Sequence, residues 1–454
     1  MRAFARQMTE RMKAAVAAGA VAAFWLAVWV FAAALVAQPL ILPGPGAVVV
    51  ALLRLVCDAS TWAILAGSGA RILGGLVLAA ACGGVLAGVS VRSRTFARLV
   101  APALSFVKAT PVACVVVLLL IWLGSARVSI AAVFLMALPG VYFSLVEGLT
   151  QVDQSLEQMF RLHGVRGWRL FCAHAWREVL PFALSCARAV IGMSWKAGVA
   201  AELIGMATGT VGERIYQAKL LIETADLLAW TVLIVAASWA CERVLVWLLR
   251  VSGPVAWRAA VRAHGRAGGS AGGGVAAELA LTVGDRVPWA PALEGLVLRV
   301  PAGGRICVMG ASGMGKSTLL SLAAGECVPC SMVFQDVRLV EDVSALDNVL
   351  LCADARVDAS SAAALLRLLV PGVDVHACVA ELSGGQRRRV EIARALLCPG
   401  GAVILDEPFT GLDTAARGAC AEVVLDLLDG RMLLLATHDA VDAHALNISD
   451  IITL

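Results

Sequence analysis

The residues with the clearest chemical meaning form the stretch GASGMGKSTLL, which follows the short apolar strand RICVM. It fits a phosphate-binding P-loop: a glycine, four intervening residues, then glycine, lysine and serine. Glycines let backbone N–H groups surround a phosphate at a helix N-terminus, the lysine reaches the β- and γ-phosphates, and the serine binds Mg²⁺. The predicted phosphate contacts are Gly310, Ser312, Gly313, Gly315, Lys316, Ser317 and Thr318.

A second acidic motif completes a site for Mg²⁺ and nucleotide. The apolar run 402–405 predicts a buried strand, and it delivers Asp406 and Glu407 at its carboxyl end. In nucleotide-hydrolysing proteins with a P-loop, the aspartate of such a strand binds Mg²⁺. We therefore expect Ser317 and Asp406 to share one metal ion, with ATP and Mg²⁺ as the ligands.

Three further motifs occur in a fixed order: FQD with Gln335, LSGGQ at 382–386, and THD with His438. Together with the P-loop they resemble the ABC ATPase family. The resemblance implies a catalytic set of Glu407, which polarises the attacking water, His438, which contacts the γ-phosphate, and Gln335, which also reaches the metal. It implies further ATP contacts from Ser383, Gly384, Gly385, Gln386 and Asp413, made to the nucleotide of an opposite subunit. A homodimer is the simplest assembly, because the chain has one such domain.

The ATPase segment departs from the family in one respect. Gln335 follows Lys316 by 19 positions, about half of the usual family interval. Much of the small antiparallel β-subdomain is therefore expected to be missing. The residue that stacks on adenine stays open between Val283, near the usual position, and Trp289, the nearest aromatic residue.

The rest of the chain has the composition of a membrane protein. Hydrophobic residues make up 60% of the 454 residues and charged residues 15%, which is too apolar for a soluble protein. The net charge of +4 does not indicate a nucleic-acid partner, and we expect none; membrane lipid is the expected environment. Apolar runs long enough to span a bilayer lie near 14–37, 63–90, 99–123, 128–149, 182–204 and 228–249.

Six helices with a cytoplasmic N-terminus agree with the distribution of basic residues. Arginine and lysine gather in the segments that would then lie inside, around 2–13, 92–98 and 161–177. After an even number of crossings the ATPase segment also lies in the cytoplasm. We expect a multi-pass protein of the cytoplasmic membrane. No predicted outside loop exceeds about 25 residues, which is too short for a folded extracellular domain.

The basic segment 156–184 lies between two spans and resembles the coupling loop of binding-protein-dependent ABC permeases. Gly164 and Leu180-Pro181 stand in register with that family's pattern, whereas Gln158-Met159-Phe160 replaces its acidic triplet and Arg177 stands at a common proline position. The resemblance covers most of residues 60–250 and is closest to the nitrate, sulfonate and taurine type. It implies a separate extracytoplasmic solute-binding protein.

Two ionisable residues lie inside the fifth apolar run, Lys196 and Glu202. Charges inside a membrane are costly and are functional candidates by default. Six positions apart, they face different sides of one helix. A role in the translocation path and a structural role at a helix end both stay open.

The predicted fold is thus a membrane helical bundle of about six helices, of the type I ABC importer class, followed by an α/β P-loop ABC ATPase domain. The domains are 1–252 for the permease, 253–275 for a flexible Gly/Ala/Ser linker and 276–454 for ATP binding. The predicted function is ATP-driven import of a small solute. An exporter half-transporter has the same domain order but needs two long intracellular loops, and one such loop is present. A signalling or remodelling device would need a large extracellular domain, and an inactive scaffold would not need Glu407 and His438.

Overall fold

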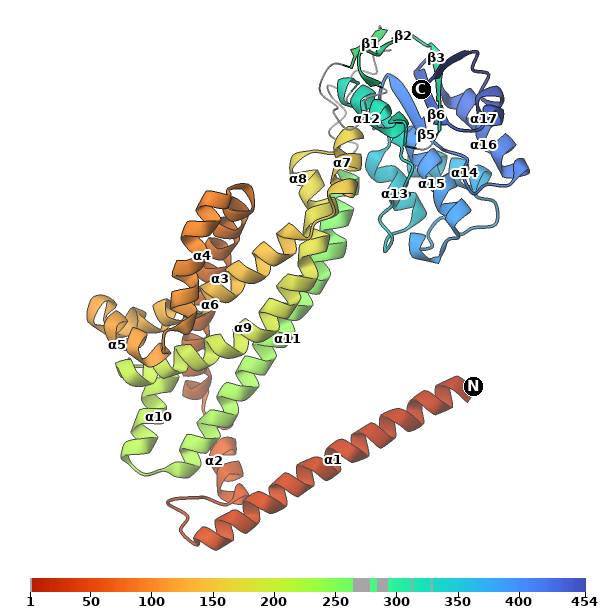
Figure 1. Cartoon of the computed structure of the whole chain (residues 1–454). Helices are drawn as coiled ribbons and strands as arrows, with labels where there is room; N and C mark the ends of the chain where they lie inside the picture. Colours follow the sequence, from red (N-terminus) through yellow and green to blue (C-terminus); the bar gives the residue numbers. More distant parts are fainter. Residues whose placement is uncertain (1, 264–277, 284–292, 312, 328–329) are drawn as a thin grey trace. The chain divides into compact units, whose positions relative to one another are not determined.

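The computed structural model describes residues 2–263, 278–283, 293–311, 313–327 and 330–454, which form two compact units. The helical unit comprises Met1–Thr150 and Val179–Val251, and the α/β unit comprises Gln151–Glu178 and Ser252–Leu454. The helices of the first unit are α1 (Arg2–Val36), α2 (Pro45–Cys57), α3 (Ala59–Arg92), α4 (Arg94–Ala109), α5 (Val112–Leu123), α6 (Ser125–Thr150), most of α9 (Trp176–Gly205), α10 (Val211–Leu220) and most of α11 (Thr224–Arg262) (Figure 1).

Four of the described helices are long and apolar enough to cross a membrane, and a bent pair raises the number to five. The four are α1, α3, α6 and α11. The run predicted over 99–123 is not one straight helix: α4 and α5 meet there at an angle of 103°, as in a broken span or a re-entrant loop. Thr110 and Pro111 separate them, since proline lacks an N–H and disfavours helical backbone in the residue before it. The fifth predicted run lies inside α9, which is not among the helices that are long and apolar enough to cross a membrane. By length and composition, the described residues therefore give four or five spans and not the six predicted.

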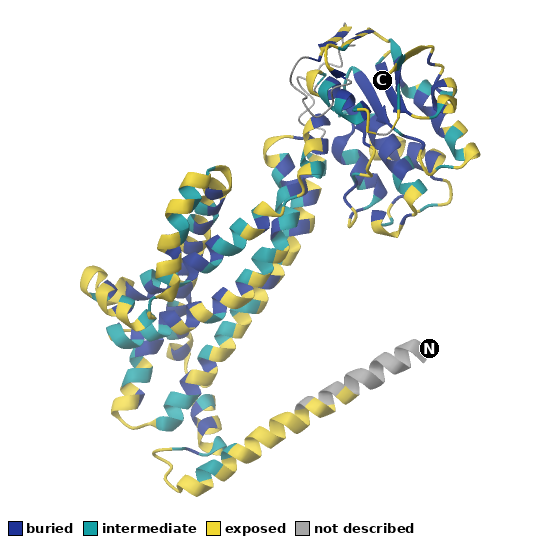
Figure 2. Ribbon diagram, in the orientation of Figure 1, coloured by how far each residue is buried: buried dark blue, intermediate teal, exposed yellow. Residues whose placement is uncertain are grey.

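The helical unit is held together mainly by close contact between α3 and α6. A Cβ atom placed on Gly75 would lie 2.6 Å from the backbone oxygen of Ile130, and one on Gly83 would lie 2.9 Å from Val141. Small residues of this kind let two helix backbones approach each other, which is how helices associate inside a membrane. The outer surfaces stay apolar and exposed; in α1 the whole spanning window from Gly19 to Val36 is unburied (Figure 2).

The α/β unit contains a five-stranded sheet in the order β4-β5-β6-β3-β7, all of whose pairs are parallel. Its strands are β3 (Arg305–Met309), β4 (Ser331–Val333), β5 (Ala402–Asp406), β6 (Met432–Thr437) and β7 (Asp450–Thr453). Every residue of β5 and β6 is buried, as expected of central parallel strands covered on both faces (Figure 2). Antiparallel pairing in the described strands is confined to β1 (Glu278–Thr282) and β2 (Val297–Pro301).

Helices complete the α/β unit. They are α12 (Lys316–Glu326), α13 (Ala345–Cys352), α14 (Ala359–Leu369), α15 (Gly384–Leu397), α16 (Thr414–Leu427) and α17 (Ala440–Ala445). The segment between α6 and α9 also belongs here, as α7 (Gln154–Leu162), α8 (Gly167–Leu170) and a π-helical turn at Phe171–Ala175. We call residues 151–178 the coupling segment.

Helix α11 extends further along the chain than the composition indicates. It runs to Arg262, so residues 253–262 of the predicted linker are helical, while 264–275 lie outside the described residues. Trp257, in this extension, is buried in the same hydrophobic cluster as Met159 and Phe160 of the coupling segment. The end of α11 is therefore part of the α/β core.

We predict that Gly75→Leu destabilises the helical unit by at least about 1–3 kcal/mol, because the larger side chain forces α3 away from the backbone of α6. The neighbouring residue gives a matched control: a Cβ on Gly74 meets nothing within 4 Å, so Gly74→Leu is expected to be tolerated. The measurement is the thermal aggregation midpoint of the full chain in detergent. Equal midpoints for the two variants would refute the close-packing argument.

Candidate functional site

The P-loop lies between β3 and α12 and has the backbone that a phosphate cradle requires. Gly313 and Gly315 have φ values of 87° and 94°, a left-handed conformation that only glycine adopts readily. The Lys316 ammonium donates to the backbone oxygens of Gly310, at 2.7 Å, and Ala311, at 3.1 Å. These two bonds hold the lysine over the loop. Ser312 lies outside the described residues, and Thr318 is half-buried on α12.

The two predicted metal ligands on β5 and α12 meet. Asp406, the last residue of β5, is buried. Burial raises the pKa of its carboxyl group, while a hydrogen bond from Ser317 lowers it. A hydroxyl and a carboxylate in contact, next to Lys316, are the oxygen donors and charge that a Mg²⁺–phosphate group takes. Ser317 and Asp406 therefore fit this ion.

Parallel pairing brings the catalytic motifs to one end of the sheet. β3 pairs with β6 so that Met309 is opposite Thr437, and β5 pairs with β6 so that Asp406 is opposite Ala436. The residues that follow these strands are therefore neighbours, since the carboxyl ends of parallel strands share one edge. Ligands of open α/β sheets bind at this edge.

Glu407 and His438 are in direct contact at this edge. His438 Nδ1 lies 3.2 Å from Glu407 Oε1, and the Thr410 hydroxyl lies 3.4 Å from Glu407 Oε2. Glu407 has a φ of 45°, which is uncommon for a residue other than glycine and costs free energy, of order 1–3 kcal/mol. Its amide N–H donates to the backbone oxygen of Ala436 at 2.9 Å. The backbone thus holds Glu407 in a strained conformation beside Asp406.

The remaining predicted residues lie on turns and helix starts. Gln335 is exposed and follows β4, whose Val333 is opposite Leu405 of β5. Ser383 caps α15 and exchanges hydrogen bonds with Gln386 in a capping box, and it is exposed together with Gly384. Asp413 caps α16 by accepting from Ala416 N–H at 2.8 Å. Val283 is buried in the core, so it does not offer a free surface to adenine; Trp289 lies outside the described residues.

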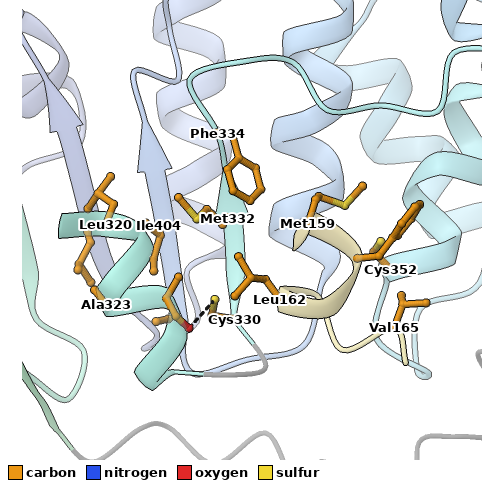
Figure 3. Packing of buried hydrophobic residues seen from close by; sticks show 14 of the residues in the cluster. Met159, Leu162, Val165, Leu320, Ala323, Cys330, Met332, Phe334, Cys352 and Ile404 are labelled. Atoms are coloured by element: carbon orange, nitrogen blue, oxygen red, sulfur yellow. Dashed lines mark hydrogen bonds between the residues drawn. The ribbon is translucent and has the colours of Figure 1, made fainter. Parts of the chain in front are cut away.

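The coupling segment binds the edge of the sheet. β4 is an edge strand, and on its free side the N–H of Cys330 donates to the Leu162 backbone oxygen at 3.1 Å. The N–H of Met332 donates to His163 Nε2, also at 3.1 Å. Around these bonds Met159 and Leu162 pack among Met332, Phe334 and other core residues (Figure 3). The segment thus completes the strand that leads to Gln335.

His163 was not identified from the sequence. It is buried, its Nδ1 has no hydrogen-bond partner among the described residues, and burial lowers its pKa to about 3. It is therefore neutral, and Nε2 accepts the strand N–H. A histidine next to a glycine in a polar loop carries no sequence signal that predicts this role.

Residues of the coupling segment that depart from the family pattern also make contacts. The Arg338 guanidinium donates to Gln158 Oε1 and to the Ser155 backbone oxygen, both at 3.2 Å. Arg177 forms an ion pair with Asp342. The glutamine and the arginine that replace the usual residues are therefore used to hold the segment on the α/β core.

The two ionisable residues of α9 have different environments. Lys196 is exposed, whereas Glu202 is fully buried and pairs with Arg71 of α3 at 3.1 Å. Glu202 also accepts from the Ser68 hydroxyl at 2.8 Å. The ion-pair partner and the hydroxyl donor satisfy this carboxylate in its buried, apolar surroundings. This network joins α3 to α9, and sequence spacing alone did not reveal it because Arg71 is 131 positions away.

Comparison with known proteins agrees with this geometry. The model for the inner membrane component of binding-protein-dependent transport systems matches residues 79–255, and the model for ABC transporters matches residues 328–410. The lipoprotein-releasing system ATP-binding protein LolD of Xanthomonas axonopodis pv. citri is 33% identical over 198 residues, which cover 36% of this chain and 81% of that protein. The chain belongs to the ABC transporter family. It has a permease domain of the binding-protein-dependent type and an ABC-type ATPase domain.

Two more similarities concern the ATPase domain of this ABC transporter. An aliphatic sulfonates import ATP-binding protein of Rhizobium johnstonii, SsuB 1, is 35% identical over 175 residues, which cover 33% of this chain and 64% of that protein. A solved structure described as the dimeric structure of MJ0796, a bacterial ABC transporter cassette, is 23% identical, with a TM-score of 0.33, and covers 39% of this chain and 91% of that one.

We predict that the α/β unit loses stability as the pH falls from about 6.5 towards 3 because of His163. In that window the unfolded chain takes up a proton on this histidine and the folded chain does not. The free energy of unfolding therefore decreases as the pH decreases. Between pH 6.5 and 5 the loss is at most about 2 kcal/mol. His163→Gln, whose amide oxygen can accept the Met332 N–H, is expected to reduce this loss.

The measurement is the melting temperature of the full chain in detergent at pH 7.5 and 5.0. His376→Gln is the matched control, because His376 is exposed and its replacement is expected to leave the pH dependence unchanged. If His163→Gln melts with the same pH dependence as the original chain, the buried neutral histidine is not the cause.

Proposed function

We propose that this chain is an ATP-driven importer of a small solute, of the nitrate, sulfonate or taurine kind, in the cytoplasmic membrane. The observation that carries the proposal is the hydrogen bonding of the coupling segment to the edge strand β4. An import-type permease sequence is joined through that segment to the strand that leads to Gln335. A movement of Gln335 when ATP binds would thus be passed to helices α6 and α9, which enter and leave the segment.

The residues at the sheet edge have the properties that ATP hydrolysis needs. Lys316 would leave its two loop oxygens and bind the β- and γ-phosphates. Glu407, held beside Asp406, would accept a proton from the attacking water. His438, in contact with Glu407, would donate to the γ-phosphate. When bound, Mg²⁺ supplies charge neutralisation for the phosphate oxygens, with Ser317 and Asp406 as its protein ligands.

Two partners belong to the proposal. The first is a second copy of the chain, because the exposed signature residues Ser383 and Gly384 would contact the nucleotide held by the other P-loop. ATP then favours the closed pair, since differential affinity for the two states is what shifts such an equilibrium. The second partner is a separate solute-binding protein outside the cell, which would present the solute to the permease. The ATPase domain would face the cytoplasm.

The relatives do not fix the solute, because one is described for sulfonate import and another for lipoprotein release. Both similarities concern the ATPase half. The import direction is instead supported by the permease half, where the binding-protein-dependent family model matches.

We predict that Glu407→Gln lowers the kcat of ATP hydrolysis by about 10²–10⁴ while ATP binding is retained, because the amide cannot accept the proton. The measurement is phosphate release from the full chain in lipid nanodiscs, together with binding of a fluorescent ATP analogue. Glu422→Gln, an exposed glutamate of α16, is the control and is expected to have full activity. Unchanged hydrolysis in Glu407→Gln would overturn the catalytic assignment.

Import itself is tested by capture of a partner. The solubilised full chain is used to capture extracytoplasmic proteins from its native envelope, and the ATPase rate is then measured with and without the captured protein and its bound small molecule. Stimulation by a solute-loaded partner is the expected result and identifies the solute. Stimulation by lipophilic compounds with no partner would instead indicate an exporter.

A further inference from the structure

Arg388, on the signature helix α15, connects three motifs of the ATPase site. Its guanidinium donates to the backbone oxygens of Phe334, of Gln335 at 2.6 Å and, more weakly, of Glu407 at 3.4 Å. The side chain is only 5% exposed. One buried cation therefore holds the backbone of the turn that carries Gln335 next to the strained backbone of the catalytic glutamate.

A carboxylate fixes the direction of this guanidinium. Glu391 lies one helical turn further along α15 and pairs with Arg388 at 2.9 Å. It is fully buried and also accepts from the Arg338 backbone N–H at 2.7 Å. Arg394 pairs with the same carboxylate at 3.4 Å and donates to the Arg338 backbone oxygen at 2.6 Å. The three charges share one buried site in which each constrains the others.

The same cluster reaches the coupling segment. Arg338 has its backbone held by Glu391 and Arg394, and its guanidinium donates to Ser155 and Gln158. A continuous series of hydrogen bonds thus runs from the coupling segment through Arg338, Glu391 and Arg388 to the oxygens of Gln335 and Glu407. All of it lies within the α/β unit.

We propose that Arg388 and Glu391 are positioning residues for hydrolysis. As a pair they fix the backbone of Gln335 against that of Glu407, and through Arg338 they connect both to the coupling segment. Neither side chain would touch ATP. Fixing the geometry of a reacting group strongly increases the reaction rate, since a displacement of about 1 Å can lower that rate about a hundredfold. The proposal depends on hydrolysis at Glu407 and not on the direction of transport.

The test is the double variant Arg388→Gln/Glu391→Gln in the full chain in nanodiscs. It removes one charge of each sign, so the buried site keeps its net charge. Arg394 loses the carboxylate at position 391 but keeps its hydrogen bond to the Arg338 backbone oxygen, and the amide oxygen introduced at position 391 can accept from it. The expected result is a fall in kcat of about tenfold to hundredfold, with KM for ATP and the melting temperature nearly unchanged. The pair Arg356–Asp354, in which the arginine is exposed and the aspartate half-buried, gives the control Arg356→Gln/Asp354→Asn, which is expected to have full kcat.

Further measurements separate positioning from mere structure. Full kcat in the double variant would overturn the proposal, and so would a loss of kcat that is matched by loss of ATP binding and a lower melting temperature. Arg388→Lys keeps the charge beside Glu391 but lacks the planar fork that reaches several oxygens, so its kcat is expected to stay low. Complete activity in this variant would show that charge alone suffices and would also overturn it. Glu407→Gln, measured in parallel, reports separately whether hydrolysis occurs at the assigned site.

Discussion

The free edge of β4 is the constraint on which the α/β unit depends. An edge strand presents unpaired backbone groups, and leaving a buried N–H without a partner costs about 1–3 kcal/mol. Here Leu162 and His163 of the coupling segment take up the N–H groups of Cys330 and Met332. The strand that leads to Gln335 is therefore completed by a segment that joins two helices of the permease, so the ATPase fold includes part of the transporter that it drives.

The sequence was sufficient to predict that the P-loop and the acidic strand end meet at one edge of the sheet, because motifs of this kind require fixed local geometry. A glycine loop before a helix, and a buried strand ending in two acids, specify where Lys316 and Asp406 lie. Parallel strands then bring these ends together without further information. The short interval between Lys316 and Gln335 was also visible in the sequence, although it did not reveal that the coupling segment lies against the resulting short strand.

Contacts between distant residues could not be predicted in this way. His163 accepts from a residue 169 positions away, and Arg71 pairs with Glu202 across 131 positions; neither pairing leaves a periodic pattern. The bend at Pro111 was missed for a different reason. Hydropathy averages over 99–123 and detects one apolar run, whereas a single proline, with its lost N–H and restricted neighbour, divides the run into two helices.

Strain at Glu407 explains why so many contacts converge on a small region. A residue with a φ of 45° is stable only when its surroundings fix it, and three supports are present: the Ala436 oxygen, the His438 ring and the Arg388 guanidinium. The first follows from sheet pairing, and the second belongs to a motif. The third depends on a buried ion pair inside α15, whose Glu391 also holds Arg338, the residue that contacts the coupling segment. A shift of that segment would thus reach Glu407 through few and short bonds, because Arg388, Glu391 and Arg394 in the middle of the series are buried and have little room to relax independently.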